Sequence, residues 1–374
     1  MKYIKQLDSL RAIAVLLVIV HHWTPLRNPM HTYTAILNGV DIFFVLSGFL
    51  ITNILLQNRN NAEQLQLPKS TIVKSFYIRR VLRIFPIYYL LLIGLLLFAG
   101  TTGTTIKENF IYYATYTVNI YFFNIQGWDG MLSHLWSLSV EEQFYLFWPW
   151  LMLFTKKRWL LPVIVFSFGV GLVAQLLLPH AGLLTFSCLD AFGAGAFLAW
   201  LLVYNPQVLV RTKLLWPILA AVSFGLQLLL MFGYPVQIPS RTLTALITLW
   251  VIVMCVKKQQ KAWLFNVVFN NPILVFLGKI SYGIYLYHLI IPHYTYDFLY
   301  NINRLLPDGI SKYHFYVYRL QNLALVILAA YLSWWLIEQP VLQLKKHFKY
   351  RKSSATNTKK VVYQSALTGE TMNN

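Results

Sequence analysis

Ten long apolar runs follow one another in this sequence, and they restrict the folds that the chain can adopt. Each run has about 17 to 25 residues, the length that an α-helix needs to cross the hydrocarbon core of a bilayer. We therefore predict an all-α fold, a polytopic membrane helix bundle of about ten transmembrane helices. The predicted spans are residues 7–23, 36–56, 81–100, 135–154, 159–178, 184–203, 214–233, 242–256, 272–291 and 320–338.

The composition supports a membrane protein and argues against two other classes. Hydrophobic residues make up 57% of the chain and charged residues 11%, whereas about a quarter of the residues of a soluble domain are charged. The net charge of +19 does not indicate nucleic-acid binding, because the Lys and Arg residues lie between apolar runs. Cys188 and Cys255 lie far apart in apolar runs, so the cysteines indicate neither a disulfide framework nor a metal site.

The distribution of Lys and Arg predicts the orientation of the bundle. With the N-terminus inside, the inner segments hold 23 of the 31 Lys and Arg residues and the outer segments hold six. Because cytoplasmic loops carry the excess of positive charge, we predict that both termini are cytoplasmic and that the protein is multi-pass in the inner (plasma) membrane. Residues 1–345 then form the membrane domain, and residues 346–374 form a basic, disordered cytoplasmic tail attracted to anionic membrane lipid.

Two predicted outer segments, 101–134 and 292–319, are long and rich in aromatic residues. They could cover an external site. Aromatic residues are also common at the headgroup level of any membrane protein, so they could equally be interfacial anchors. The sequence leaves both interpretations open.

The first apolar run contains Arg11, His21 and His22, which are costly in hydrocarbon and interrupt what would otherwise resemble a signal peptide. We read it as an uncleaved first helix. Eleven residues turn an α-helix through about 1100°, so Arg11 and His22 share one face, roughly 16 Å apart along the axis. Imidazole titrates near neutral pH, which makes His22 a candidate general base. The simpler interpretation of Arg11 is a polar contact with Asp8, three residues earlier.

A cluster of three arginines lies at the cytoplasmic mouth of the third span. Arg79 and Arg83 are one helical turn apart and Arg80 lies on an adjacent face, so the sequence predicts that their guanidinium groups converge on a multiply charged anion. Arg binds phosphate through paired hydrogen bonds, which suits a nucleotide-like ligand. The alternative is a positive-inside anchor, although Lys would serve that purpose equally well.

Polar residues in the second and fourth spans allow both a structural and a functional interpretation. Ser47 and Gly48 form a small surface that favours close helix packing. Near the start of the fourth span, Ser139 could cap a helix with Glu141 or Glu142 in its first turn, where one carboxylate would complement the helix dipole. Helix capping explains one of these carboxylates better than it explains two.

Together, these residues resemble the acyltransferase-3 family of integral membrane acyltransferases, which includes O-antigen acetylases. The resemblance covers about residues 3–345, and seven motifs occur in the family's order. The motifs are Leu-Asp-x-Leu-Arg11, Arg11-x10-His22, Gly39-Val-Asp-x-Phe-Phe-x-Leu-Ser-Gly-Phe49, Arg79-Arg-x-x-Arg-Ile-x-Pro86, Trp136-Ser-Leu-x-Val-Glu-Glu-Gln-Phe-Tyr145, Ile280-Ser-Tyr-Gly-Ile-Tyr-Leu-Tyr-His288 and Glu338-x-Pro340.

The resemblance implies transfer of an acyl group, by default acetyl, from cytoplasmic acyl-CoA to a hydroxyl of an extracytoplasmic or lipid-linked carbohydrate. Acyl-CoA would be a co-substrate, with no tightly bound cofactor and no metal. The expected catalytic residues are His22, Arg11, Glu141 and Glu142. The expected binding residues for CoA are Arg79, Arg80 and Arg83. Residues expected to bind substrate or support the site are Asp8, Asp41, Ser47, Trp136, Tyr145, Tyr282 and His288.

Two departures from the family and several alternatives accompany this reading. Cys188 stands where some members have an arginine two residues before the equivalent of Asp190, so a donor-binding role for that arginine is not carried over. Relatives fused to an extracytoplasmic hydrolase-like domain have hundreds of further residues that this sequence lacks, so the contribution of that domain to acceptor handling is either absent or supplied by a separate extracytoplasmic partner protein. The sequence does not distinguish direct transfer from a covalent acyl-His22 intermediate. The competing function is a transporter or exporter without acyl transfer, since buried charges also suit proton-coupled transport.

Overall fold

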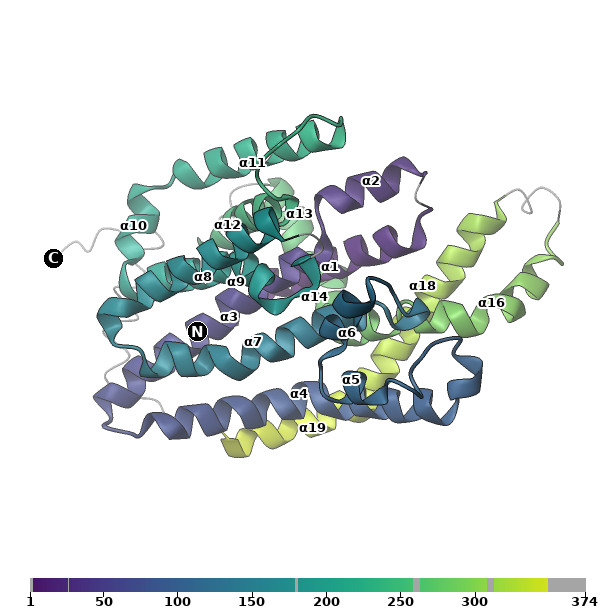
Figure 1. Ribbon diagram of the computed structural model, residues 1–374, viewed down its shortest axis with the longest axis horizontal. Coiled ribbons are helices and arrows are strands. Elements are labelled where there is room, and N and C mark those ends of the chain that lie inside the picture. The colour runs from purple at the N-terminus through teal and green to yellow at the C-terminus, as the bar shows by residue number, and fades with distance from the viewer. Residues whose placement is uncertain (1–2, 26, 179–180, 258–262, 308–312, 349–374) are drawn as a thin grey trace.

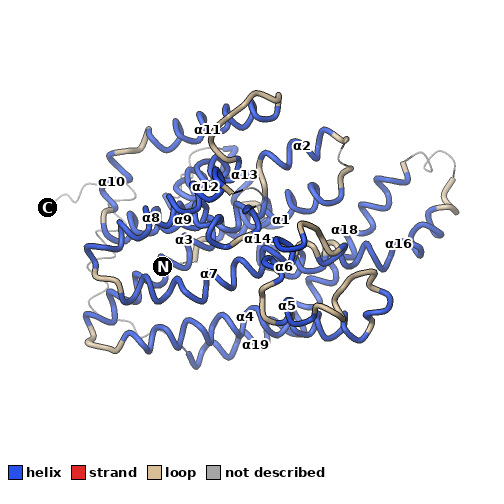
Figure 2. The backbone as a smooth tube through the Cα atoms, in the orientation of Figure 1, coloured by secondary structure: helices blue, strands red, loops and turns tan. Residues whose placement is uncertain are grey.

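The computed structural model describes residues 3–25, 27–178, 181–257, 263–307 and 313–348. All secondary structure in these ranges is helical (Figure 2), which confirms the predicted all-α class. The predicted cytoplasmic tail lies outside the described residues from position 349 onward. The α-helices are α1 (Lys5–Trp23), α2 (Pro29–Ile36), α3 (Gly39–Gln64), α4 (Lys69–Leu97), α5 (Phe110–Ala114), α6 (Val118–Ile125), α7 (Leu135–Phe154), α8 (Lys157–Leu177), α9 (Leu189–Tyr204), α10 (Pro206–Arg211), α11 (Leu215–Met231), α12 (Ser240–Lys257), α13 (Trp263–Phe269), α14 (Pro272–Lys279), α15 (Ser281–Tyr287), α16 (Ile290–Asn303), α18 (His314–Ser333) and α19 (Gln339–Gln343).

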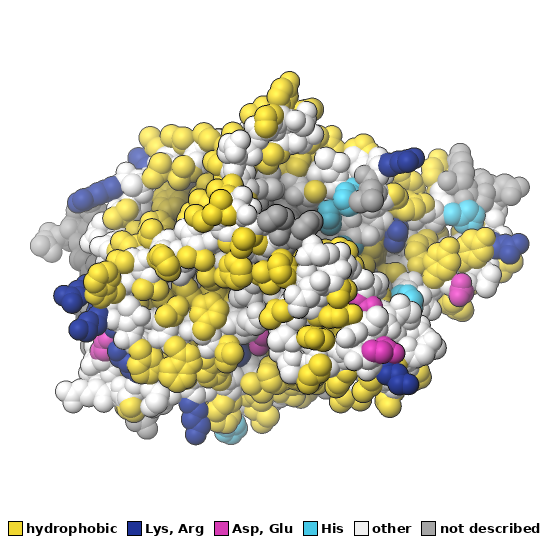
Figure 3. All heavy atoms as spheres, in the orientation of Figure 1, with side chains coloured by type: hydrophobic (Ala, Val, Ile, Leu, Met, Phe, Trp, Pro, Cys, Tyr) yellow, Lys and Arg dark blue, Asp and Glu magenta, His cyan; other side chains and the backbone are white. Residues whose placement is uncertain are grey.

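Six helical segments in the described part of the chain are long and apolar enough to cross a membrane, which makes this a polytopic helical membrane protein. Several long helices run along the long axis of the molecule (Figure 1), and hydrophobic side chains cover much of the face between its two ends (Figure 3). Polar and charged side chains within α1 and α7 lower the apolar character of those two helices. The six segments are Pro29–Gln64, Lys69–Leu97, Lys157–Leu177, Thr185–Tyr204, Ser240–Lys257 and His314–Phe348.

Helix α3 lies in the core and packs closely against α9. A Cβ atom on Gly48 would lie 2.1 Å from the carbonyl oxygen of Phe192, and one on Gly195 would lie 2.0 Å from the carbonyl oxygen of Val45. Only glycine allows the two backbones to approach this far. The close packing predicted at Ser47-Gly48 is therefore confirmed for Gly48.

We expect Gly48→Val to destabilise the bundle by about 1–3 kcal/mol, because the added side chain would collide with the backbone of α9. The measurement is the thermal unfolding temperature of the detergent-purified protein, which should fall. Gly94→Val is the matched control, since no heavy atom lies within 4 Å of a Cβ built on Gly94. Equal unfolding temperatures for the two variants would contradict the proposed tight α3–α9 contact.

The ninth predicted span, 272–291, is wrong as one continuous helix. The structure divides it into α14, α15 and the start of α16. At the end of α14, a Cβ on Gly278 would lie 1.8 Å from the carbonyl oxygen of Asp8, so the backbones of α1 and α14 are nearly in contact. The hydroxyl of Ser281 donates a 3.0 Å hydrogen bond to the Gly278 carbonyl at this break. The division thus brings a second segment close to the polar part of α1.

The segment 101–134, predicted to lie outside, contains α5, α6 and the 3-10 turn Gly130–Leu132, which follows Asp129. The Asp129 carboxylate accepts hydrogen bonds from the Thr105 backbone N–H at 2.9 Å and from the Tyr113 hydroxyl at 2.5 Å. Burial, followed by this hydrogen bond, raises the pKa of Tyr113, so the phenol remains a donor. The segment is therefore an ordered part of the fold in the described chain.

Candidate active site

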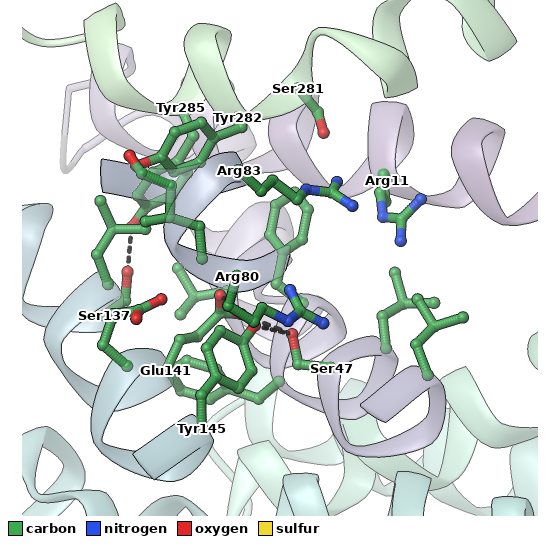
Figure 4. A pocket seen from close by; sticks show the side chains of 18 residues that line it. Arg11, Ser47, Arg80, Arg83, Ser137, Glu141, Tyr145, Ser281, Tyr282 and Tyr285 are labelled. Carbon is green, nitrogen blue, oxygen red and sulfur yellow. Dashed lines mark hydrogen bonds between the residues drawn. The ribbon is translucent and has the colours of Figure 1, made fainter. Parts of the chain in front are cut away.

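A pocket inside the bundle brings together polar residues from five helices (Figure 4). Arg11 comes from α1, Ser47 from α3, Arg80 and Arg83 from α4, and two glutamates from α7. Groups of this kind are costly in hydrocarbon, so the bundle turns them toward one another. The lining residues are Arg11, Val40, Phe43, Phe44, Leu46, Ser47, Leu50, Arg80, Arg83, Ile84, Ser137, Leu138, Glu141, Glu142, Tyr145, Ser281, Tyr282 and Tyr285.

On one side of the pocket, Ser47, Glu141 and Tyr145 form a closed triangle of hydrogen bonds. The Ser47 hydroxyl lies 3.0 Å from one oxygen of Glu141 and 2.9 Å from the Tyr145 hydroxyl. Tyr145 donates to the other Glu141 oxygen at 2.9 Å. The guanidinium of Arg80 lies over the Tyr145 ring, 4.5 Å from its centroid. These contacts fix the positions of the carboxylate and of the cation beside it.

The other cations of the pocket are Arg83 and Arg11, whose guanidinium groups point toward one another (Figure 4). Arg11 also forms the short-range pair that its spacing predicts, at 2.5 Å from a carboxylate oxygen of Asp8. Glu142 lines the pocket, and no hydrogen bond to its carboxylate is seen among the described residues. Asp8 pairs with the Arg11 charge, and Arg80 and Arg83 share the pocket with Glu141 and Glu142. The planar guanidiniums of Arg80 and Arg83 still offer several N–H donors to an anionic ligand.

Of the three arginines of α4, Arg79 does not face the pocket. Its guanidinium points to the C-terminal segment, 3.5 Å from the carbonyl oxygens of Lys345 and Phe348. Arg79 is absent from the pocket lining, whereas Arg80 and Arg83 are part of it. The buried face of α4 carries Val73, Phe76, Ile84 and Ile87 among its residues, and this face sets the rotation of the helix.

Two aromatic residues expected to support the site lie at its wall. The Tyr282 hydroxyl donates to the carbonyl oxygen of Ile84 at 3.2 Å, which ties α15 to α4. The Trp136 ring meets the Phe44 ring edge-on, with centroids 6.1 Å apart. Tyr282 lines the pocket, while Trp136 stands behind Phe44.

His22 lies in the last turn of α1 and is not among the residues that line the pocket. Its side chain is exposed, and its Nδ1 atom lies 2.9 Å from Nε2 of His288. The Glu141 carboxylate is hydrogen-bonded to Ser47 and Tyr145 rather than to this imidazole. In the described part of the chain, no group of three or more His, Cys, Asp and Glu side chains is arranged to hold a metal ion.

Asp41, expected to support the site, instead forms a buried ion pair with Arg241 of α12, at 2.9 Å. The same guanidinium donates to the carbonyl oxygen of Gly182 at 2.8 Å and lies 3.1 Å from the sulfur of Cys188. Arg241 directly precedes the predicted span 242–256, and its spacing in the sequence gives no sign that it pairs with Asp41. Arg241 thus places a guanidinium beside Cys188. Some family members have an arginine at the position equivalent to Cys188.

Two more residues of the site were not singled out from the sequence, although both lie within the quoted motifs. The hydroxyl groups of Tyr285 and Ser137 lie 2.5 Å apart in the pocket wall. The Tyr285 ring also contacts the rings of His288 and His134, at centroid distances of 5.4 and 5.6 Å. Tyr285 therefore belongs both to the pocket and to the histidine group.

Comparison with known proteins places these residues in a family. A family profile described as an acyltransferase domain matches residues 4–338. A Staphylococcus aureus (strain COL) protein provisionally named as an O-acetyltransferase is 31% identical, and the match covers 91% of this chain and 57% of that protein. The chain thus spans little more than half the length of this relative. No solved structure matches the chain.

Relatives named for a cell-wall substrate match over shorter stretches. The peptidoglycan O-acetyltransferase OatA of Listeria monocytogenes is 36% identical over 189 residues, which cover 46% of this chain and 28% of that protein. A Bacillus subtilis protein provisionally named as a peptidoglycan O-acetyltransferase is 37% identical over 159 residues, 40% of this chain and 23% of that protein. The profile match over most of the sequence shows that the chain belongs to the acyltransferase-3 family and is related to these O-acetyltransferases.

Proposed function

We propose that this protein is a membrane O-acetyltransferase that moves an acetyl group from cytoplasmic acetyl-CoA to a carbohydrate hydroxyl on the outer side. The observation that carries the proposal is the pocket, which gathers three guanidiniums and two carboxylates, one guanidinium coming from α1, the helix with the exposed His22 in its last turn. The names of the relatives favour a cell-wall glycan such as peptidoglycan as the acceptor. The proposal includes ten spans with both termini cytoplasmic, as the distribution of Lys and Arg favours.

The donor would be bound through its phosphates. Arg80 and Arg83 offer planar guanidiniums suited to phosphate oxygens, and Arg11 adds a third cation on the facing helix. The thioester end of the donor would then extend along α1 from Arg11 toward His22. On this proposal, the triangle of Ser47, Glu141 and Tyr145 holds Arg80 in place, and Glu142 is available to bind a substrate hydroxyl or amide.

The proposed chemistry is acyl transfer with general base catalysis by His22. The imidazole takes the proton of the acceptor hydroxyl while its oxygen attacks the thioester carbonyl carbon. The carbon–sulfur bond then breaks, CoA leaves as a thiolate, and the imidazolium returns the proton to the sulfur. The products are the O-acetyl ester and CoA thiol, and no water is consumed.

The test is release of free CoA thiol from acetyl-CoA by the purified protein in lipid vesicles, with and without peptidoglycan fragments. We expect release that depends on the fragments and an acetyl ester on the recovered glycan. Binding of CoA without release would reject this acceptor class and leave the donor assignment standing. Absence of both binding and release would reject the transferase and favour a transporter.

A further inference from the structure

His288 stands directly behind His22 and is held rigidly. Its side chain is fully buried, with 0% exposure, although His22 is exposed. The Nδ1 atom of His288 lies 2.5 Å from the backbone carbonyl oxygen of Tyr285. The indole N–H of Trp23, the residue after His22, donates to the His288 carbonyl at 2.8 Å. Two helices thus lock the pair of imidazoles together.

The hydrogen bond to Tyr285 determines which nitrogen of His288 carries a proton. A carbonyl oxygen can only accept, so Nδ1 of His288 must be the donor. A second proton on Nε2 would make the ring a cation, and among its described contacts no carboxylate is present to compensate for its burial. An unpaired buried charge costs several kcal/mol. The ring is therefore neutral, and Nε2 is an acceptor.

The state of His288 in turn determines the tautomer of His22. Because Nε2 of His288 can only accept, Nδ1 of His22 must donate the hydrogen bond that joins them at 2.9 Å. A neutral His22 then has no proton on Nε2, which becomes the nitrogen available to a substrate. We infer that His288 is a positioning residue that fixes the Nδ1–H tautomer of His22 and so presents Nε2 as the base.

This inference rests on the proposed function for its catalytic part, while the tautomer itself does not depend on it. A carboxylate fills the orienting role in the Ser-His-Asp triad. Here a neutral imidazole fills it, and the bond strengthens when His22 takes up a proton because the donor becomes charged. The neighbouring His21 makes no such link: its ring stacks on His31 at 4.2 Å and its Nδ1 lies 3.4 Å from the Thr34 hydroxyl.

The activity test compares His288→Gln with His288→Leu. Both are similar in size to histidine, but only the glutamine side chain keeps an acceptor oxygen near the position of Nε2. We expect His288→Leu to lower kcat about 100-fold or more with KM for acetyl-CoA nearly unchanged, and His288→Gln to recover at least ten-fold of that loss. Equal losses in both variants, at equal thermal unfolding temperature, would overturn the positioning role.

The second test reads the tautomer directly and needs no activity. In 15N-histidine-labelled wild-type protein, the His22 signals, identified by their loss in His22→Ala, should show a protonated Nδ1 and an unprotonated Nε2. In His288→Leu, the Nε2–H form should appear. A wild-type His22 protonated on Nε2 would overturn the inference whatever the kinetics. Wild-type protein that shows the expected tautomer without transferring acetyl would instead reject the proposed function alone.

Discussion

Replacing His22 with alanine is expected to lower the rate of acetyl transfer by about 100- to 10,000-fold, the usual contribution of a general base. Binding of CoA should be nearly unchanged, because the proposed phosphate-binding arginines lie in the pocket and His22 does not line it. The measurements are the rate of CoA thiol release and the dissociation constant for CoA in the same vesicles.

The matched control for this variant is His21→Ala, one residue earlier on the same helix. His21 contacts His31 and Thr34 rather than His288, so its removal should leave most of the activity. Full activity in His22→Ala would move the base to His21 or to the buried His134. A strong loss in both variants would point to disruption of the outer end of α1.

The second large effect is expected from Arg83→Met, which removes a pocket cation while keeping most of the side-chain volume. A hydrogen bond to a charged group is worth about 1.5–3 kcal/mol, so the dissociation constant for CoA should rise about 10- to 100-fold. The affinity for the carbohydrate acceptor should change much less. Isothermal titration with each ligand measures the two effects separately.

Arg79→Met is the natural comparison, because it removes the same charge four residues earlier on α4. The Arg79 guanidinium faces backbone carbonyls of the C-terminal segment and does not line the pocket. The dissociation constant for CoA should therefore change less than three-fold. Equal weakening by the two substitutions would indicate a general electrostatic attraction rather than a binding pocket. Equal effects of Arg83→Met on donor and acceptor would reject the assignment to the donor.

The pocket was largely accessible to sequence reasoning, because hydrocarbon penalises polar groups. Arg11, Ser47, Arg83 and Glu141 occur in separate apolar runs, and each must avoid lipid, so the bundle interior is where they can meet. The order of family motifs then identified most of the lining. The sequence therefore predicts which residues form the site, but not the distances or hydrogen bonds between them.

The rotation of α4 was less accessible, although a signal exists. The spacing of Arg79 and Arg83 suggested one shared face, but the apolar residues Val73, Phe76 and Ile84 define a buried face that includes Arg80 and Arg83. The helical period of these apolar residues, extended to the arginines, places Arg80 and Arg83 nearer the buried face than Arg79. The spacing of the arginines alone does not show this difference.

Contacts between distant residues could not be predicted from one sequence. His22 and His288 are 266 positions apart, and Arg241 meets Asp41 across 200 positions. Periodicity and charge counts describe single helices, whereas these pairs depend on how α1, α12 and the broken segment α14–α16 pack. At the break between α14 and α15, Gly278 approaches the backbone of α1, a contact across 270 positions.

The position of Tyr285 bears on how well the protein keeps protons from crossing the membrane. Its ring is buried, lines the arginine pocket and contacts two histidines, and its hydroxyl is bonded to Ser137. Under the proposed function, donor and acceptor arrive from opposite compartments, and an open watery route between them would let protons flow down their gradient.

We expect Tyr285→Ala to increase the proton leak of vesicles over wild type and over Tyr287→Ala; equal leaks would reject this role. The ring between the arginine pocket and the histidines would then also protect the energy stored across the membrane.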